Sequence, residues 1–201
     1  MPKAASTSVL RRLVTKSEAL SAIAADLERD GVTANLRETA TQLVFGEGSP
    51  TADIMLVGEA PGAQEDRQGQ PFVGASGKFL AEMLAGIGLT RPDVYITNIV
   101  KYQPPANRDP TPAEIAASLP YLMRQIETIQ PKLIVLLGRH SMNVFLPELK
   151  ISQAHGQPVR KDGQVYLPLF HPAAALYNGS MRQTLIDDFN LIPGIINNLT
   201  K

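Results

Sequence analysis

One apolar stretch and the loop behind it constrain this sequence more than any other feature. Residues 54–57 read I-M-L-V, which is too short for a helix, and Gly58 ends the run, so we predict a buried β-strand. The following loop has the acidic side chains Glu59, Glu65 and Asp66 among glycines and prolines. Ligands in open parallel sheets bind beyond the carboxyl ends of the strands. We therefore expect a functional site in this loop, with a plain solvated connection to the next helix as the alternative.

Three further runs of β-branched and apolar residues predict three more strands, at residues 94–98, 133–137 and 165–170. Helical spacing of apolar residues predicts helices around them. These helices cover residues 8–29, a stretch after Gly74, a stretch after Thr111, a short stretch up to residue 145, and residues 180–197 with a break at Pro193. Strands that alternate with helices favour a parallel sheet with helices on both faces, and so a single α/β domain over residues 1–201.

Turn and capping residues mark several helix ends. Asp30 and Gly31 are expected to stop the first helix. Thr111 and Glu114 have the spacing of a capping box, which predicts a helix start. Pro120 inside that helix is expected to kink it or to begin a helix of its own.

The composition excludes some classes of site. The sequence contains no cysteine, so disulfides and thiolate-bound metals are excluded. The absence of a long apolar run or a signal-peptide core favours a cytoplasmic or nucleoid-associated protein without a membrane span. The net charge of zero does not by itself indicate a nucleic-acid binder. A local basic rim remains open, and its candidates are Lys101, Arg108, Arg160, Lys161 and Arg182.

Three separated motifs resemble, in order, those of the uracil-DNA glycosylase superfamily, specifically its family 4. The first reads G-E-A-P-G at residues 58–62, followed by E-D and by G-Q-P-F-V-G-A-S-G at residues 69–77. The second reads N-I-V-K at residues 98–101, followed by P-P-A-N-R, and the third reads H-P-A-A-A-L at residues 171–176. The resemblance implies a three-layer α/β/α sandwich around a four-stranded parallel sheet. It also implies a monofunctional enzyme that releases uracil from DNA and leaves an abasic site.

The resemblance implies roles for three side chains around a flipped-out uracil. His171 would donate a hydrogen bond to O2 of the departing base, where negative charge grows. Asn98 would read O4 and N3–H through its amide, and Phe72 would stack on the base. Each has a simpler alternative: a structural histidine after a strand, a turn-forming asparagine, and a core phenylalanine that anchors its loop.

The roles of the acidic residues stay open. Glu59 or Glu65, or both, would position water and offset the positive charge on the sugar, and both are catalytic candidates. Glu65 could instead orient Asn98 or His171, and Asp66 could simply cap a turn. The backbone of Ala60, Pro61 and Gly62 is expected beside the base, which gives the remaining substrate-binding candidates.

Uracil-containing DNA is the expected partner of a monomeric protein. DNA contacts are expected from the motif loops, with Leu176 as a wedge into the gap left by the base or as ordinary core. The other DNA-binding candidates are Lys101, Arg108, Asn178, Ser180 and Arg182. Few phosphate contacts predict weak binding that falls steeply with salt. His140 and His155 receive no role.

Family 4 enzymes usually hold an iron–sulfur cluster on four cysteines, and this chain departs from that pattern. The equivalent positions are Gly31, Ala34, Tyr102 and Ser118, none of which ligates iron as a thiolate does. We therefore expect no cofactor and no metal, with the Tyr102 ring filling part of the cluster volume. Alternatives to uracil excision are activity on hypoxanthine or xanthine, a silent nucleic-acid binder, and a nucleotide hydrolase, the last disfavoured because no phosphate loop is present.

Overall fold

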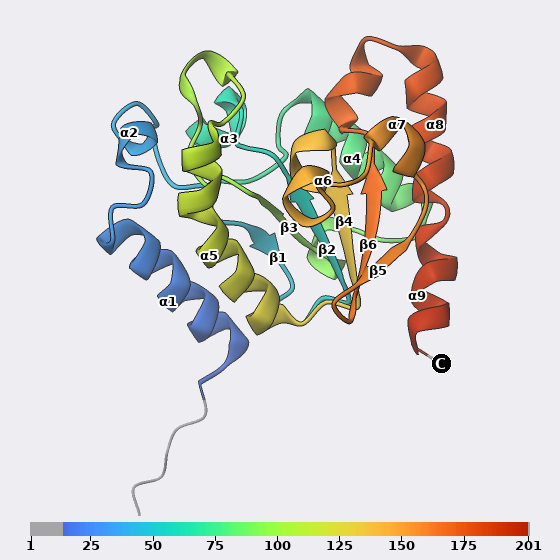
Figure 1. Cartoon of the computed structure of the whole chain (residues 1–201), viewed down its shortest axis with the longest axis horizontal. Helices are drawn as coiled ribbons and strands as arrows, with labels where there is room; N and C mark the ends of the chain where they lie inside the picture. Colours follow the sequence, from blue (N-terminus) through green and yellow to red (C-terminus); the bar gives the residue numbers. More distant parts are fainter. Residues whose placement is uncertain (1–13, 201) are drawn as a thin grey trace, which may run out of the picture.

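The computed structural model describes residues 14–200, which form a mixed sheet between two helical layers (Figure 1). The strand order is β1-β3-β2-β4-β6-β5. Four central strands run parallel, namely β3 (Tyr95–Asn98), β2 (Ile54–Gly58), β4 (Leu133–Leu137) and β6 (Gln164–Leu169). The predicted α/β class and its four parallel strands are confirmed.

Two short antiparallel strands extend the sheet beyond the four predicted parallel strands. They are β1 (Glu47–Gly48), which pairs with β3, and β5 (Val159–Lys161), which pairs with β6. Neither has the apolar run of a central strand, because each covers an edge and stays partly exposed. Asp162 and Gly163 join β5 to β6 with positive φ angles of 49° and 82°, as an Asp-Gly hairpin turn requires.

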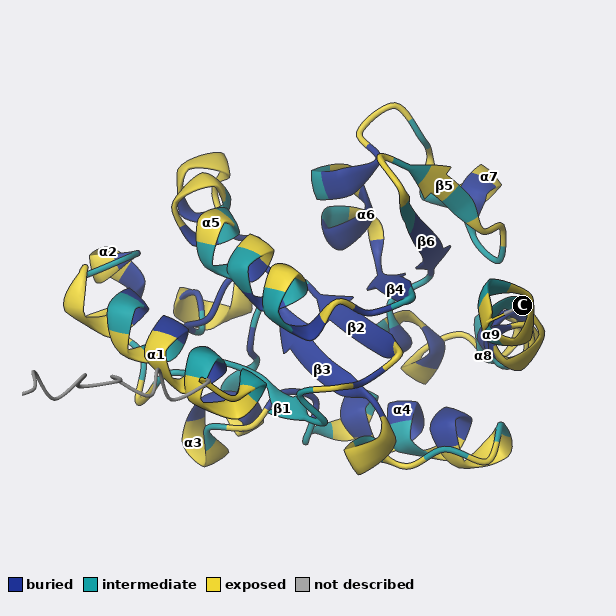
Figure 2. Cartoon of the chain, turned by 90° about the horizontal axis from the view of Figure 1, so that it is seen from below, coloured by how far each residue is buried: buried dark blue, intermediate teal, exposed yellow. Residues whose placement is uncertain are grey.

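Side chains of the central strands alternate between the two faces, which explains why the runs read as continuously apolar. Met55 and Val57 pack on one face, whereas Ile54 and Leu56 pack on the other. The first face is covered by α1 (Lys16–Arg29), α2 (Ala34–Arg37), α5 (Pro112–Ile129) and α6 (Arg139–Phe145). The second is covered by α4 (Ala75–Gly86), α8 (Gly179–Phe189) and α9 (Ile192–Thr200). Figure 2 shows the buried strands between these layers.

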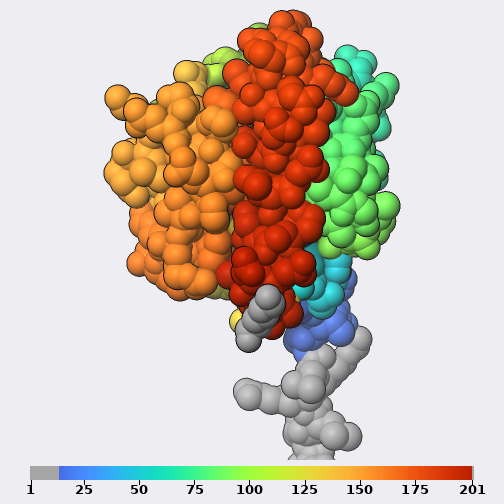
Figure 3. Space-filling view, turned by 90° about the vertical axis from the view of Figure 1, so that its right-hand side faces the viewer, coloured from blue at the N-terminus to red at the C-terminus, as the bar shows by residue number. Residues whose placement is uncertain are grey.

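The remaining helices are short and lie in the connections. They are α3 (Ala63–Gln68) and α7 (Ile151–Ala154), with 3-10 turns η1 (Arg91–Asp93), η2 (Pro105–Asn107) and η3 (Pro172–Leu176). In Figure 3 the C-terminal helices α8 and α9 form a red column beside the green surface of α4. None of the helices within residues 14–200 is long and apolar enough to cross a membrane.

Helix ends differ from the prediction at two places. Within the described residues the first helix is α1, which begins at Lys16 because Thr15 is an extended N-cap in a capping box with Glu18. The predicted start at residue 8 lies outside the described part of the chain. The last helix is broken at Asn190 and Leu191 and not at Pro193, because a proline is tolerated in the first turn of the new helix α9.

Helix α5 begins where the capping-box pattern predicted a helix start. The box of Thr111 and Glu114 starts α5 as predicted. Pro120 lies inside α5, which continues as one helix to Ile129.

Candidate active site

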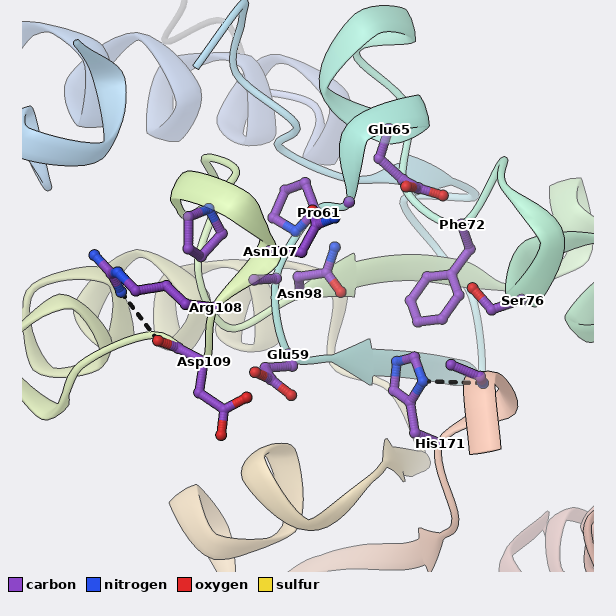
Figure 4. Close-up of a pocket in the computed structure, with 14 residues that line it drawn as sticks. Glu59, Pro61, Glu65, Phe72, Ser76, Asn98, Asn107, Arg108, Asp109 and His171 are labelled. Carbon is purple, nitrogen blue, oxygen red and sulfur yellow. Dashed lines mark hydrogen bonds between the residues drawn. The ribbon is translucent and has the colours of Figure 1, made fainter. Parts of the chain in front are cut away.

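A cavity of about 330 Å³ opens at the carboxyl ends of β2 and β3 and beside the loop after β6 (Figure 4). All eight residues predicted to be catalytic or substrate-binding line it. They are Glu59, Ala60, Pro61, Gly62, Glu65, Phe72, Asn98 and His171. The other lining residues are Ser76, Pro104, Asn107, Arg108, Asp109 and Ala173. Parallel strands explain this convergence, because their carboxyl ends meet at one edge of the sheet.

Asn98 lines the cavity, and its side chain contains a buried acceptor without a partner in the described part of the chain. It ends β3 directly beside Gly58 of β2 and is 1% exposed. Its Oδ1 atom has no hydrogen-bond partner within residues 14–200. A Cβ on Gly58 would lie 2.3 Å from this oxygen and 2.6 Å from the Phe72 ring, so only glycine leaves both groups their space. A buried acceptor without a partner is costly, which favours a ligand that brings an N–H donor.

His171 is held in one tautomer at the opposite side of the cavity. Its Nδ1 accepts a hydrogen bond of 3.1 Å from the Ala173 amide, so the neutral ring has its proton on Nε2. Burial lowers the pKa of His171 to about 4, although the Glu65 carboxylate opposes this shift. The imidazole is thus neutral near pH 7, and its free nitrogen points into the cavity (Figure 4).

Phe72 forms a wall of the cavity. It is 5% exposed, and its ring lies 5.7 Å from the His171 ring at an interplanar angle of 29°. Figure 4 shows the ring facing inward beside Ser76. A flat face of this kind, next to polar groups at its edge, suits a planar heterocycle.

The two glutamates have different surroundings. Glu65 Oε1 accepts hydrogen bonds from the Val73 and Gly74 amides at 2.9 and 2.8 Å, so this carboxylate anchors the loop that contains Phe72. Glu59 is half-buried, and burial raises its pKa while the nearby His140 opposes the rise. Its Oε2 lies 3.8 Å from His140 Nε2. Of the two glutamates, only Glu65 is thus held by backbone amides.

Asp66 does not cap its own turn, which corrects the prediction. Its carboxylate accepts hydrogen bonds from the Thr41 amide at 2.9 and 3.0 Å, across 25 residues of sequence. It is 4% exposed and ties the segment before β1 to α3.

Lys101 is not a phosphate ligand, so that prediction is wrong. The side chain is 1% exposed, and its Nζ donates to Thr97 Oγ1, the Asn98 carbonyl and Gln125 Oε1 at 2.6, 2.7 and 2.6 Å. Burial lowers its pKa well below the ordinary value. The amine supports the backbone of Asn98 from behind the cavity.

The other basic candidates lie in three different places. Arg108 lies at the rim of the cavity, where it makes two hydrogen bonds to the Glu114 carboxylate and stays 40% exposed. Arg160 and Lys161 belong to β5 and pair with the amino end of β6, away from the cavity. Arg182 binds Glu82 and lies over the Phe79 ring in a separate groove between α4 and α8.

The loop after His171 contains an exposed aromatic residue that the sequence analysis missed. Leu176 is 39% exposed, and its neighbour Tyr177 is 91% exposed. Asn178 is the N-cap of α8, and its Oδ1 accepts hydrogen bonds from the amide and hydroxyl of Ser180. This hydrogen bonding gives Asn178 and Ser180 a structural role at the start of α8. Contact of either residue with phosphate stays a prediction.

Asp109 and His140 also gather at the cavity mouth without having been predicted. Ligand atoms of Glu59, Asp109 and His140 lie within 4.8 Å of one another, a geometry that could hold a cation. The Arg139 guanidinium already bonds to Asp109 at 3.2 Å and occupies part of that space. In the sequence, His140 lies two residues after Gly138, which ends a predicted strand. This position could have indicated that His140 belongs to the site.

The residues at the cluster-equivalent positions do not fit an iron–sulfur cluster. Tyr102 and Ser118 are 2% and 1% exposed, and their hydroxyls have no hydrogen-bond partner in the described part of the chain. Burial raises the pKa of Tyr102, which keeps its hydroxyl protonated and unsuited to bind iron. Gly31 and Ala34 have no side-chain atom that could bind iron. The Tyr102 ring packs in the core on this face. That it fills part of the volume of a cluster stays a prediction.

Comparisons with known proteins agree with the motifs. A family model described as the uracil DNA glycosylase superfamily matches residues 45–191. A type-4 uracil-DNA glycosylase of Sulfurisphaera tokodaii is 48% identical over 162 residues, which cover 76% of this chain and 74% of that protein. A type-4 enzyme of Archaeoglobus fulgidus is 47% identical over 79% of this chain and 84% of that protein. A type-5 uracil-DNA glycosylase of Thermus thermophilus is 33% identical over 70% of each chain.

Proposed function

This chain belongs to the uracil-DNA glycosylase superfamily, and on that premise we propose that it hydrolyses the N1–C1′ bond of deoxyuridine in DNA. The products are free uracil and an abasic site. The observation that supports this most strongly is the unpaired, buried Oδ1 of Asn98. Uracil brings an N3–H donor to such an acceptor, whereas cytosine has only a lone pair at N3.

In this proposal Asn98 and Phe72 recognise the base. Asn98 Oδ1 accepts from N3–H, and its amide nitrogen donates to O4. The Phe72 ring stacks on the base, an interaction worth about 1–3 kcal/mol. The base enters by leaving the helix, because its reacting bond is out of reach inside a duplex.

Bond cleavage uses His171, which lies beside Phe72, and Glu59. As N1 departs with the bonding electrons, negative charge spreads to O2, where the neutral His171 donates its Nε2–H. Positive charge develops on the sugar, and Glu59 stabilises it and positions the water that adds to C1′. The water supplies the hydroxyl of the abasic sugar, and its proton ends on the released base. No lysine of the motifs lies free for attack on C1′, since Lys101 is fully buried.

An excision assay tests this function. A single-stranded oligonucleotide with one uracil is incubated with the protein and then treated with alkali, which cuts abasic sites. We expect cutting at the uracil, none in a thymine-containing control, and a loss of about 100-fold or more in Asn98→Asp, which removes the amide donor. An uncut uracil strand at stoichiometric protein would overturn the proposal. Hypoxanthine and xanthine strands in the same assay test the alternative specificity.

We further propose that the enzyme acts as a cytoplasmic monomer and needs neither metal nor cluster. The reaction described above requires only water, DNA and side chains. Excision at an unchanged rate in excess chelator is the expected result, and a lost rate that returns with a divalent cation would contradict it.

A further inference from the structure

Phe72 adopts a strained backbone conformation at the edge of the cavity. Its φ angle is 52°, in the left-handed region that bulky residues other than glycine rarely enter. Such a conformation persists only when the surrounding structure fixes it. The residues that fix Phe72 therefore decide where its ring lies before a base arrives.

Arg91 holds the carbonyl side of this segment from outside the cavity. It opens η1, just before β3, and is not among the cavity-lining residues. Its Nη1 donates to the Phe72 carbonyl at 2.8 Å, and its Nη2 donates to the Pro71 carbonyl at 2.6 Å. Glu47 of β1 orients the guanidinium through Oε2, 3.1 Å from Nη2. The planar fork of an arginine is suited to two acceptors side by side.

Two other contacts hold the same segment from different sides. The Glu65 carboxylate accepts from the amides of Val73 and Gly74, the two residues after Phe72. The start of α4 presses against Phe72, since a Cβ on Gly77 would lie 1.8 Å from its carbonyl oxygen. Arg91 thus binds the carbonyls of Pro71 and Phe72, and Glu65 binds the amides of the next two residues.

We propose that Arg91 is a positioning residue, which holds Phe72 in the conformation that stacks on the extruded base. This inference rests on the proposed function, because stacking is needed only if a base enters the cavity. A ring that is fixed in advance loses little conformational freedom on binding, so more of the stacking energy appears as affinity. Glu47 acts one step further away by orienting Arg91.

A double-mutant cycle tests the proposal. Arg91→Ala and Arg91→Lys are each made in the wild-type chain and in Phe72→Ala, with excision of uracil followed under single-turnover conditions. Arg124→Ala is the matched control, because Arg124 also pairs with one carboxylate but contacts Asp26 in the α1–α5 layer. We expect Arg91→Ala to lower kcat/KM about tenfold in the wild-type chain and to change it little in Phe72→Ala, as expected for residues that act through one contact.

The outcomes separate this inference from the proposed function. A wild-type rate in Arg91→Ala, or an equal loss in both backgrounds, overturns the role of Arg91 while uracil excision stands. A wild-type protein without excision overturns the proposed function and this inference together. If Arg91→Ala fails to fold, Arg91→Lys and Glu47→Gln provide the same comparison with smaller changes. Binding of free uracil, followed by NMR, is the second readout, and it should weaken in parallel.

Discussion

At the scale of single residues, the site depends on the states of a few buried polar atoms. Asn98 Oδ1 is an acceptor without a partner in the described chain, and His171 Nδ1 is an acceptor that already has one. The first therefore selects for a donor on the ligand, whereas the second fixes the proton of the ring on Nε2. Burial favours neutral groups, so recognition and leaving-group stabilisation need no charged imidazole.

His171 gives a prediction that does not depend on activity. Because burial lowers its pKa to about 4, the ring should stay neutral as pH falls through the ordinary histidine range. Long-range proton–nitrogen NMR should show an Nε2-protonated ring between about pH 5 and 8, the range in which an unperturbed histidine changes charge. His171→Gln identifies the signal by its loss. A His171 signal that titrates near the ordinary value would contradict the account.

At the scale of secondary structure elements, Glu114 joins three parts of the chain. Its carboxylate accepts from the Thr111 amide at the start of α5, from Asn35 Nδ2 in α2, and from Arg108 at the cavity rim. Hydrogen bonding to Arg108 is the largest cause that lowers its pKa to about 2. The same carboxylate therefore caps a helix and holds the loop that borders the cavity.

Replacing this carboxylate should destabilise the fold in a pH-dependent way. The folded-state pKa of about 2 lies below the ordinary 4.5, so the stabilisation is complete above pH 4.5 and is lost as pH falls towards 2. Glu114→Gln should lower the free energy of unfolding by about 1–3 kcal/mol at pH 7 and by less at pH 3. Urea unfolding at both pH values measures this. A difference between the two proteins that is the same at both pH values would contradict it.

At the scale of the whole molecule, the sheet determines which side chains meet. Four apolar runs were enough to predict the parallel strands, whose following loops meet at one edge of the sheet. The eight cavity residues were predicted from the three motifs and the family that they resemble. The two edge strands could not be predicted, because β1 and β5 have no apolar run of their own. Lys101 could not either, since a lysine is normally exposed and its three acceptors come from Thr97, Asn98 and the distant Gln125.

The corrected placement of the basic residues changes the expected DNA affinity. Lys101 is buried, Arg160 and Lys161 lie at the other end of the sheet, and Arg182 is bound to Glu82. Of the five candidates Arg108 alone stays at the cavity rim, so few phosphates are neutralised and the slope of log K against log salt should be no steeper than about −2. Fluorescence anisotropy with an abasic-analogue duplex measures the slope. A value steeper than about −5 would mean that a larger basic surface binds DNA.

The account depends most on how the cavity holds a base, and a crystal structure of the protein with uracil tests this directly. We predict that uracil N3 lies about 2.9 Å from Asn98 Oδ1, that O2 faces His171 Nε2, and that the base stacks on Phe72. Uracil bound outside this cavity, or in it with the Asn98 amide turned away, would contradict the account.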